Sequence, residues 1–335
     1  MFRQNKKVGL YLIIIALILS FSYLPLPYYI YSPGTAEALD KVVSVADSTE
    51  SEGDLHLVTV RGGQATPLTF MLASFSDYQD IHHMDELFPE GYDRDSYMQT
   101  QLKMMENSQD AAVVVAYQAA GESVDITYEG VYVVSVVEGM PAEESLQTAD
   151  KIIEVGNTKV IDAEHLIELV DGYQIGEQIP FLIERDDQQF ETMIELAPFP
   201  DKPEQSGIGI QLVTNREVEI ERPVEFTSGD IGGPSAGFIL ALEIYDQLVE
   251  ADLTKGLDIA GTGEIDYEGN IHSIGGVDKK VIAADREKCD IFFVPNEQGK
   301  EKSNYQVAKE TAKDIGTDMV IVPIDTFQDA LDYLK

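Results

Sequence analysis

Cysteine and basic residues are scarce in this chain of 335 residues. The single cysteine, Cys289, excludes an internal disulfide and a cysteine-rich metal site. Only 23 lysines and arginines stand against 60 aspartates and glutamates, which gives a formal net charge of −37. Because such a charge repels phosphate backbones, we expect no nucleic-acid partner. With 44% hydrophobic residues the chain is still apolar enough to fold, and its length suggests roughly two or three domains.

Charge is absent from one long stretch near the N-terminus. Three basic residues lie within residues 1–7, and the run from Val8 to Leu24 then carries no charge. Its length of about 17 residues is near the short end for a membrane-spanning helix, and Pro25 and Pro27 follow it. Basic flanks stay on the cytoplasmic side. We therefore expect a cytoplasmic tail over 1–7, a single-pass anchor in the cell membrane over 8–30, and an extracellular remainder.

A cleaved signal peptide is the alternative for this segment. Ala36-Glu37-Ala38 has the A-x-A form of a cleavage site. It lies about a dozen residues beyond the apolar run, however, which is too far for ordinary cleavage. The uncleaved anchor is the favoured interpretation.

Residues 31–125 show strand and helix patterns separated by acidic segments. Leu55–Val60 alternates as a strand does, and Met104–Ala120 has the composition of a helix that ends at a glycine. Asp77–Tyr97 is acidic and irregular, and we expect it to be a surface excursion. We expect the strand and the helix to pack on a domain formed later in the chain.

Three runs in the middle of the chain belong together. A β-rich run is followed by a turn with Pro-Ala and then by a second strand; in order these are Gly130-Val131-Tyr132-Val133-Val134, Glu138-Gly139-Met140-Pro141-Ala142 and Ala149 to Asn157. This order resembles the PDZ domains of bacterial periplasmic proteases, over residues 126–199. The resemblance implies that an extended peptide binds by strand addition. By position, the binding loop would be formed by Glu129, Gly130, Val131 and Tyr132, and a spacer with a closed groove is the alternative.

A serine lies in a run of small residues before an apolar helix. The run is Gly232-Gly233-Pro234-Ser235-Ala236-Gly237, and the helix follows over 238–249. Proline suits the first turn of a helix, where free N–H groups and the helix dipole favour negative charge. Ser235 could therefore be a nucleophile whose oxyanion is stabilised there, or simply the cap of a tight turn.

Two later motifs favour the nucleophile. They are Gly261-Thr262-Gly263-Glu264 and Ile274-Gly275-Gly276-Val277-Asp278-Lys279-Lys280. Together with the serine motif they resemble the Lon proteolytic domain of the S16 serine peptidases, over residues 200–335. The resemblance implies a dyad of Ser235 as nucleophile and Lys280 as general base. It also implies that Thr262 positions the lysine, that Gly233, Pro234 and Ala236 shape the loop, and that no cofactor or metal is needed.

A lysine base requires a large pKa shift. An ordinary lysine has a pKa near 10.4, and lowering it by about 3 units disfavours the ammonium form by roughly 4 kcal/mol. Burial against Val277 and Val281 could supply this shift.

The sequence departs from classical Lon proteases at two points. Gly232 occupies the position of an aspartate, and the nearby Asp230 is not aligned with it. No G-x-x-x-x-G-K-[ST] run is present, so we expect no ATP-driven unfolding.

Other catalytic or metal-binding readings are weaker. His272 has Ser273 beside it and Asp266 nearby, but neighbours on a strand point to opposite faces. Cys289 has no histidine arrangement around it and reads as a buried residue. Adjacent His82 and His83 lack a third ligand, so we expect a surface loop and no metal.

The order of the three parts resembles the membrane-anchored PDZ–Lon proteases of Gram-positive bacteria. It predicts an α+β fold with an N-terminal transmembrane helix, a PDZ-like domain and a Lon-type proteolytic domain. The predicted function is an ATP-independent serine endopeptidase that cleaves extracellular or membrane-associated peptides and proteins. The alternative is a non-catalytic, membrane-anchored PDZ adaptor with a Lon-like scaffold. Lon domains often form rings, so the resemblance also allows a homo-oligomer.

Overall fold

The computed structural model describes residues 23–49, 51–87, 94–185, 188–200, 202–227, 229 and 231–335. The chain forms two compact units. The first combines the chain up to Ser123 with Arg222–Lys335, and the second is Val124–Glu221. The second unit is therefore inserted into the first, so that the first unit is built from both ends of the chain.

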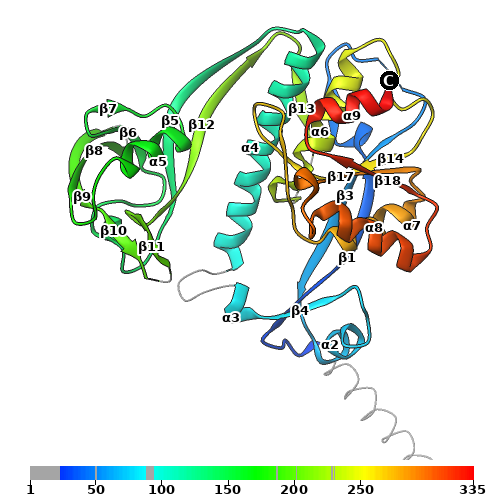
Figure 1. Ribbon diagram of the computed structural model, residues 1–335, viewed down its shortest axis with the longest axis horizontal. Coiled ribbons are helices and arrows are strands. Elements are labelled where there is room, and N and C mark those ends of the chain that lie inside the picture. Colours follow the sequence, from blue (N-terminus) through cyan, green and yellow to red (C-terminus); the bar gives the residue numbers. More distant parts are fainter. Residues whose placement is uncertain are drawn as a thin grey trace, which may run out of the picture. The chain divides into compact units, whose positions relative to one another are not determined.

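A mixed sheet forms the centre of the first unit (Figure 1), in the order β18-β17-β14-β3-β1-β4. These strands are β1 (Tyr28–Ala38), β3 (Leu55–Gln64), β4 (Asp80–His83), β14 (Ile259–Gly261), β17 (Ile291–Pro295) and β18 (Val320–Ile324). β14 runs parallel to β3 and β17, whereas β1 runs antiparallel to β3 and β4. The early strands are thus paired directly with the late ones.

Helices pack around this sheet. They are α2 (Pro67–Ala73), α3 (Met84–Leu87), α4 (Arg94–Ala120), α6 (Gly237–Leu248), α7 (Val277–Glu287), α8 (Asn304–Ile315) and α9 (Phe327–Leu334). Two short ladders complete the unit: β2 (Val43–Val45) with β13 (Val224–Phe226), and β15 (Glu264–Ile265) with β16 (Ile271–His272). α4 contacts α6, and α7 contacts both β1 and β3.

The structure corrects three expectations about the first part of the chain. Residues 28–30, which we assigned to the anchor, belong to β1, because their backbone pairs with β3 and β4. The irregular segment predicted over 77–97 contains β4 and α3, and α4 begins at Arg94 rather than at Met104. Among the described residues no helix is both long and apolar enough to cross a bilayer, and residues 8–22 of the anchor expected over 8–30 lie outside them.

The second unit is a small antiparallel sheet with one helix. Its strand order is β12-β5-β6-β8-β9, with β7 beside β6. The elements are β5 (Val124–Val136), β6 (Lys151–Val155), β7 (Thr158–Lys159), α5 (Ala163–Asp171), β8 (Gln178–Arg185), β9 (Gln188–Glu195) and β12 (Ile210–Ile220), and the short pair β10 (Ala197–Phe199) and β11 (Lys202–Gly207) lies between β9 and β12. Because β12 pairs along β5, the unit extends to Glu221 and not to residue 199 as in the predicted division.

α6 carries a buried carboxyl group into the core of the first unit. The side chain of Glu243 is 7% exposed and accepts a hydrogen bond from the Gln247 amide at 2.6 Å. Burial raises the pKa of Glu243 to about 7. The folded state therefore binds a proton that the unfolded chain releases above about pH 4.5, and this group destabilises the fold as pH rises toward 7.

We expect Glu243→Gln to stabilise the protein above pH 7. The amide keeps an acceptor for Gln247 and removes the cost of a buried charge, which amounts to at most about 3 kcal/mol. Urea unfolding of parent and variant at pH 5 and pH 8 measures the difference, which should be small at pH 5. An equal difference at both pH values would contradict the account.

Candidate active site

Ser235 lies in a short 3-10 turn, Pro234–Ala236, that leads into α6. The turn is preceded by Gly233 at φ +94°, a backbone conformation that glycine adopts without strain. The N–H of Gly233 donates to the Gln101 carbonyl of α4 at 2.7 Å. The glycine thus lets the chain turn sharply under α4 and present Ser235 at the start of α6.

Hydrogen bonds from two directions fix this turn. The Ser235 carbonyl accepts from the N–H of Gly263 at 2.9 Å and from the hydroxyl of Thr262 at 3.0 Å. From the other side, the Ser108 hydroxyl of α4 donates to the Pro234 carbonyl at 2.8 Å. Ser235 is therefore held between α4 and the segment Thr262–Glu264.

The last glycine of the motif has a packing role. A Cβ atom at Gly237 would lie 2.4 Å from Ser108 Oγ and 2.8 Å from Ile265 Cγ2. We expect Gly237→Ala to displace the Ser235 turn, lowering both the free energy of unfolding and the rate of peptide cleavage. Gly63→Ala is the matched control, because nothing lies within 4 Å of its Cβ position. Equal stability and activity of the two variants would contradict this role.

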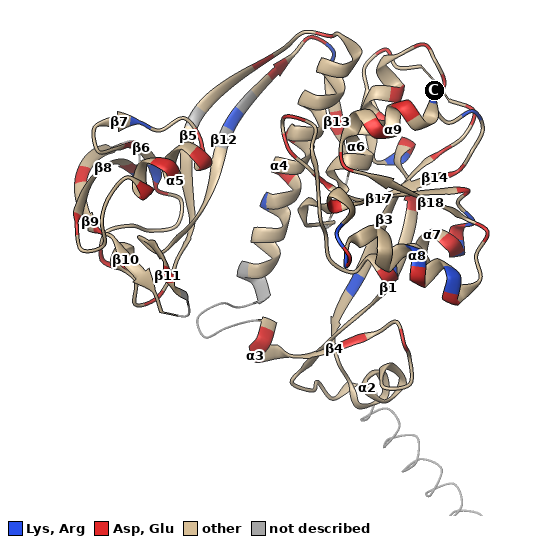
Figure 2. Cartoon of the chain, viewed as in Figure 1, with Lys and Arg blue, Asp and Glu red and all other residues tan. Residues whose placement is uncertain are grey.

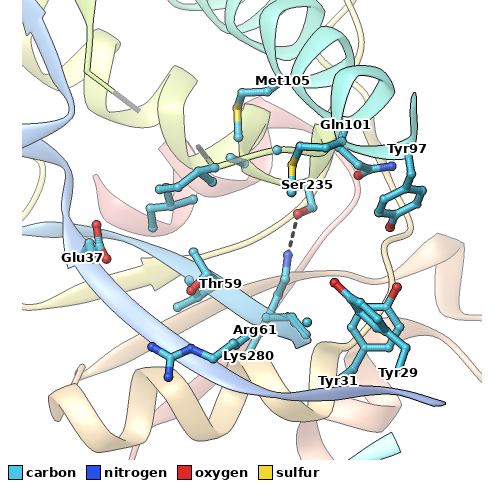
Figure 3. Close-up of a pocket in the computed structure, with 18 residues that line it drawn as sticks. Tyr29, Tyr31, Glu37, Thr59, Arg61, Tyr97, Gln101, Met105, Ser235 and Lys280 are labelled. Carbon is cyan, nitrogen blue, oxygen red and sulfur yellow. Dashed lines mark hydrogen bonds between the residues drawn. The ribbon is translucent and has the colours of Figure 1, made fainter. Parts of the chain in front are cut away.

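Lys280 lies in the first turn of α7, and its side chain contacts Ser235. Its Nζ lies 2.6 Å from Ser235 Oγ and 2.9 Å from Thr262 Oγ1, and Figure 3 shows the two functional groups pointing toward one another. The lysine is 4% exposed and Thr262 is 0% exposed. Burial lowers the pKa of Lys280 to about 7, so a large fraction of its amine is neutral at neutral pH.

The neighbouring lysine differs in its partners. Lys279 is equally buried, but its Nζ lies 2.5 Å from Asp80 Oδ2 and 3.0 Å from Asp278 Oδ2. Lys279 is thus a paired ammonium, whereas Lys280 contacts two hydroxyl groups. Asp230, which lies near the motif but is not aligned with the aspartate of classical Lon proteases, lies outside the described residues.

Two clefts open on the serine. One, of about 410 Å³, is lined by Ser235 and Lys280 together with Tyr29, Tyr31, Glu37, Thr59, Arg61, Tyr97, Gln101 and Met105, among others. Figure 3 shows the tyrosines on one side of the dyad and Glu37, Thr59 and Arg61 on the other. The second cleft, of about 460 Å³, also contains Ser235 and Lys280 and continues along Ser273–Gly276. The Ser235 hydroxyl is thus reached from two adjoining clefts that share Tyr31, Tyr97 and Gln101 in their linings.

Most of the first cleft's lining comes from outside the serine and lysine motifs. Tyr31 lies on β1, and Tyr97 and Gln101 lie on α4. Sequence reasoning missed these residues because the sequence does not show which early segments reach the serine. The only indication in the sequence was that the strand Leu55–Val60 and the helix Met104–Ala120 were expected to pack on the later domain, which brings early residues near the serine.

The other candidate catalytic residues lie elsewhere. His272 Nε2 is 2.9 Å from Asp266 Oδ2, and both residues line a separate cleft on the far side of Pro234. Cys289 is buried in the core beneath α7, and burial raises the pKa of its thiol to about 12. His82 and His83 lie in β4 and not in a loop, since β4 pairs with β1.

A second group of potential ligands lies at the start of β3 and β14. Asp54, His56 and Asp258 offer ligand atoms within 4.8 Å of one another, a spacing that could hold a metal ion. His56 Nε2 lies 3.4 Å from Asp258 Oδ1. The sequence, from which we expected no metal, could not reveal this group because Asp258 lies about 200 residues after Asp54 and His56.

The predicted peptide-binding residues of the second unit occupy the interior of its sheet. Val131 and Tyr132 pair with β12 on one side and with β6 on the other. A strand with partners on both sides has no free edge for an added peptide. The edge strands of this sheet are β12 and β9. Of the two, β12 contacts α5, and Gly209 at φ +86° precedes it. Peptide binding at Glu129–Tyr132 stays a prediction, and the backbone pairing shows only that Val131 and Tyr132 lie inside the sheet.

The Ser235 hydroxyl lies at the start of a helix and is hydrogen-bonded to the buried amine of Lys280. This arrangement is typical of a serine hydrolase with a lysine base. Residues 193–334 match the family model "Lon protease (S16) C-terminal proteolytic domain", and residues 97–196 match the PDZ domain model. The chain therefore carries a Lon-type proteolytic domain, a serine peptidase domain, together with a PDZ domain. This confirms the resemblance drawn from the motifs.

Relatives support the same assignment. The Lon protease of Aster yellows witches'-broom phytoplasma is 30% identical over 123 residues, which cover 37% of this chain and 14% of that protein. The Lon protease of Campylobacter jejuni is 33% identical over 102 residues, 30% of this chain and 12% of that protein. The chain thus matches about one-seventh of the length of these relatives.

Solved structures resemble the PDZ part. The PDZ domain of an SdrC-like protein from Listeria monocytogenes is 29% identical and covers 27% of this chain and 93% of its own, with a TM-score of 0.25. A solution structure from Geobacillus thermodenitrificans is 34% identical over 24% of this chain and 94% of its own, with a TM-score of 0.23.

Proposed function

We propose that this protein is a membrane-anchored serine endopeptidase that works without ATP and cleaves extracellular or membrane-associated peptides and proteins. The observation that carries the proposal is the 2.6 Å separation of Lys280 Nζ and Ser235 Oγ in a site where burial lowers the pKa of the amine to about 7.

The neutral amine of Lys280 takes the proton of the Ser235 hydroxyl as Oγ attacks the carbonyl carbon of the substrate. The resulting oxyanion faces the N-terminal end of α6, where the Ser235 N–H and the helix dipole stabilise negative charge. The ammonium then returns the proton to the leaving amine, and an acyl-enzyme remains. Water attacks this ester with Lys280 again as base, which releases the second product and restores the serine.

Thr262 has a positioning role in this proposal. Its hydroxyl donates to the Ser235 carbonyl and leaves its oxygen to accept from Lys280. One side chain thereby sets the distance between nucleophile and base. Its full burial keeps water from taking either hydrogen bond.

The proposed substrate is an extended segment of peptide or protein. Two clefts meet at Ser235, and aromatic side chains line one of them. The PDZ domain would bind a further part of the same substrate or a partner protein at its β12 edge. The proposed anchor is the uncharged run of residues 8–24, with its basic flank in the cytoplasm and the peptidase domain outside the cell.

The test uses the full chain in detergent, mixed with a library of peptides, with release of products followed by mass spectrometry. We expect cleavage by the parent and by Ser76→Ala, an exposed serine away from the site, and no cleavage by Ser235→Ala. Rates should be equal with and without ATP. Cleavage by Ser235→Ala at the parental rate would overturn the proposal, and the absence of cleavage by the parent would favour the adaptor.

A further inference from the structure

Helix α2 has apolar side chains on two faces. On its inner face, Phe70 and Ala73 pack in a small core with Ile30 and Ala65. A Thr66 capping box begins the helix, so its position and rotation are well defined. The inner face alone accounts for the attachment of α2 to β1 and β4.

The opposite face is apolar and exposed. Leu68, Met71, Leu72 and Phe75 are 39%, 51%, 57% and 87% exposed. Leu68, Met71 and Leu72 lie on α2, and Phe75 lies in the turn after the helix, where its N–H donates to the Leu72 carbonyl at 3.2 Å. The spacing of three, four and seven residues is that of one side of a helix. We call these four residues the outer face of α2. A contiguous apolar patch of this kind on a soluble surface marks an interaction site.

Charge is missing from this part of a strongly acidic protein. Residues 62–76 contain no charged side chain, although the chain has a net charge of −37. Figure 2 shows α2 without Lys, Arg, Asp or Glu. A surface without negative charge can approach anionic headgroups, which the rest of the protein repels.

The outer face lies beside the point where the uncharged N-terminal run reaches the fold. The Leu26 N–H donates to the Ala65 carbonyl at 2.8 Å, one residue before the cap of α2. Tyr23 and Leu24, the last two residues of the uncharged 8–24 run, are 80% and 58% exposed. A bilayer that holds this run therefore lies next to α2.

We propose that the outer face of α2 inserts into the interfacial layer of the lipid bilayer beside the anchor. This inference rests on the anchoring proposed above and adds a second membrane contact. An apolar helix face buried in the interface gains free energy in proportion to the area it buries, without requiring anionic lipid. Two contacts with the membrane orient the first unit, whereas a single flexible attachment would not.

The end of the uncharged run also limits the height of the active site above the membrane. Tyr31, which lines the catalytic cleft, is the seventh residue after Leu24, so the two are at most about 24 Å apart along the chain. The proposal thus favours substrates whose cleaved bond lies close to the membrane surface.

The absence of tryptophan from the sequence allows a direct test. Phe75→Trp, in the full chain reconstituted into phosphatidylcholine vesicles, introduces the single indole at a highly exposed position. We expect its emission to shift to shorter wavelength and to lose most of its intensity when the lipid chains are brominated. Tyr333→Trp is the control, because Tyr333 is 49% exposed on α9, at the other end of the same unit in Figure 1. Its emission should be insensitive to the brominated lipid.

The proposal would be overturned if brominated lipid did not quench the emission of Phe75→Trp. It would also be overturned if the blue shift persisted without lipid, because contact with a second copy or with another protein segment would then explain the shift. Flotation of the protein with the vesicles measures membrane anchoring separately, and cleavage of a peptide measures peptidase activity. A protein that floats and cleaves but shows no quenching therefore fails this inference alone. As a second readout, Leu72→Ser/Phe75→Ser should slow cleavage of a lipid-tethered peptide several-fold and leave cleavage of the same free peptide unchanged.

Discussion

Lys280→Met will abolish peptide cleavage and at the same time stabilise the fold. Methionine has a similar length and no basic nitrogen, so Ser235 loses its proton acceptor. General-base catalysis contributes up to about 10⁴-fold, and we expect kcat/KM to fall by about 10³-fold or more. Arg286→Ala, an exposed position on the same helix, should retain parental activity.

The stability of the same variant distinguishes loss of the base from unfolding. Burial lowers the pKa of Lys280 from 10.5 to about 7, which costs the folded state up to about 4 kcal/mol at pH 7. Methionine removes this cost but loses the hydrogen bonds to Ser235 and Thr262, so we expect a net gain of about 1–3 kcal/mol in the free energy of unfolding. Urea denaturation at pH 7 measures it. An inactive variant that is less stable than the parent would contradict this prediction.

The rate of cleavage will depend on pH with an apparent pKa near 7. Only the neutral amine of Lys280 accepts the serine proton, so kcat/KM should fall tenfold for each pH unit below that value. Between about pH 5 and about pH 8 the expected change is about 100-fold. The contribution of Lys280 to the free energy of unfolding also rises with pH, above the range in which Glu243 lowers it. Because the unfolded chain binds more protons than the folded state between pH 7 and 10.5, stability rises with pH across that window.

Initial rates with a peptide that has no ionisable side chains will give the profile, with circular dichroism at each pH to show that the protein stays folded. A profile that is flat across this range, or an apparent pKa near that of free lysine, would show that Lys280 is not the base.

The residues of the candidate catalytic site were predictable because their motifs are local. The glycines and proline around Ser235 are required by the backbone of one turn, and Lys280 follows a glycine at φ +69° that begins α7. Short-range constraints of this kind are visible in the sequence. The family comparison then identified the same segment independently.

The surroundings of the site were less predictable because they depend on long-range pairing. β1 reads as the end of an apolar anchor, yet its tyrosines lie in the sheet and line the cleft. The first turns of α4, from Arg94, are too polar to indicate a helix, although Gln101 on this helix holds the Gly233 turn. In the PDZ unit, β12 (Ile210–Ile220) lies beyond the segment 126–199 that the motifs cover, so the sequence did not show that it forms an edge of the sheet.

The most direct measurement of the central claim is the pH-dependent acylation of Ser235. A serine-directed acylating probe is added to the full chain in the absence of substrate, and the modified residue and its rate of formation are read by peptide mass mapping. The account predicts a single adduct on Ser235 whose rate rises through pH 7 in the parent and in Arg286→Ala, and no adduct in Lys280→Met. An adduct on another serine, or equal acylation of Ser235 in Lys280→Met, would contradict it.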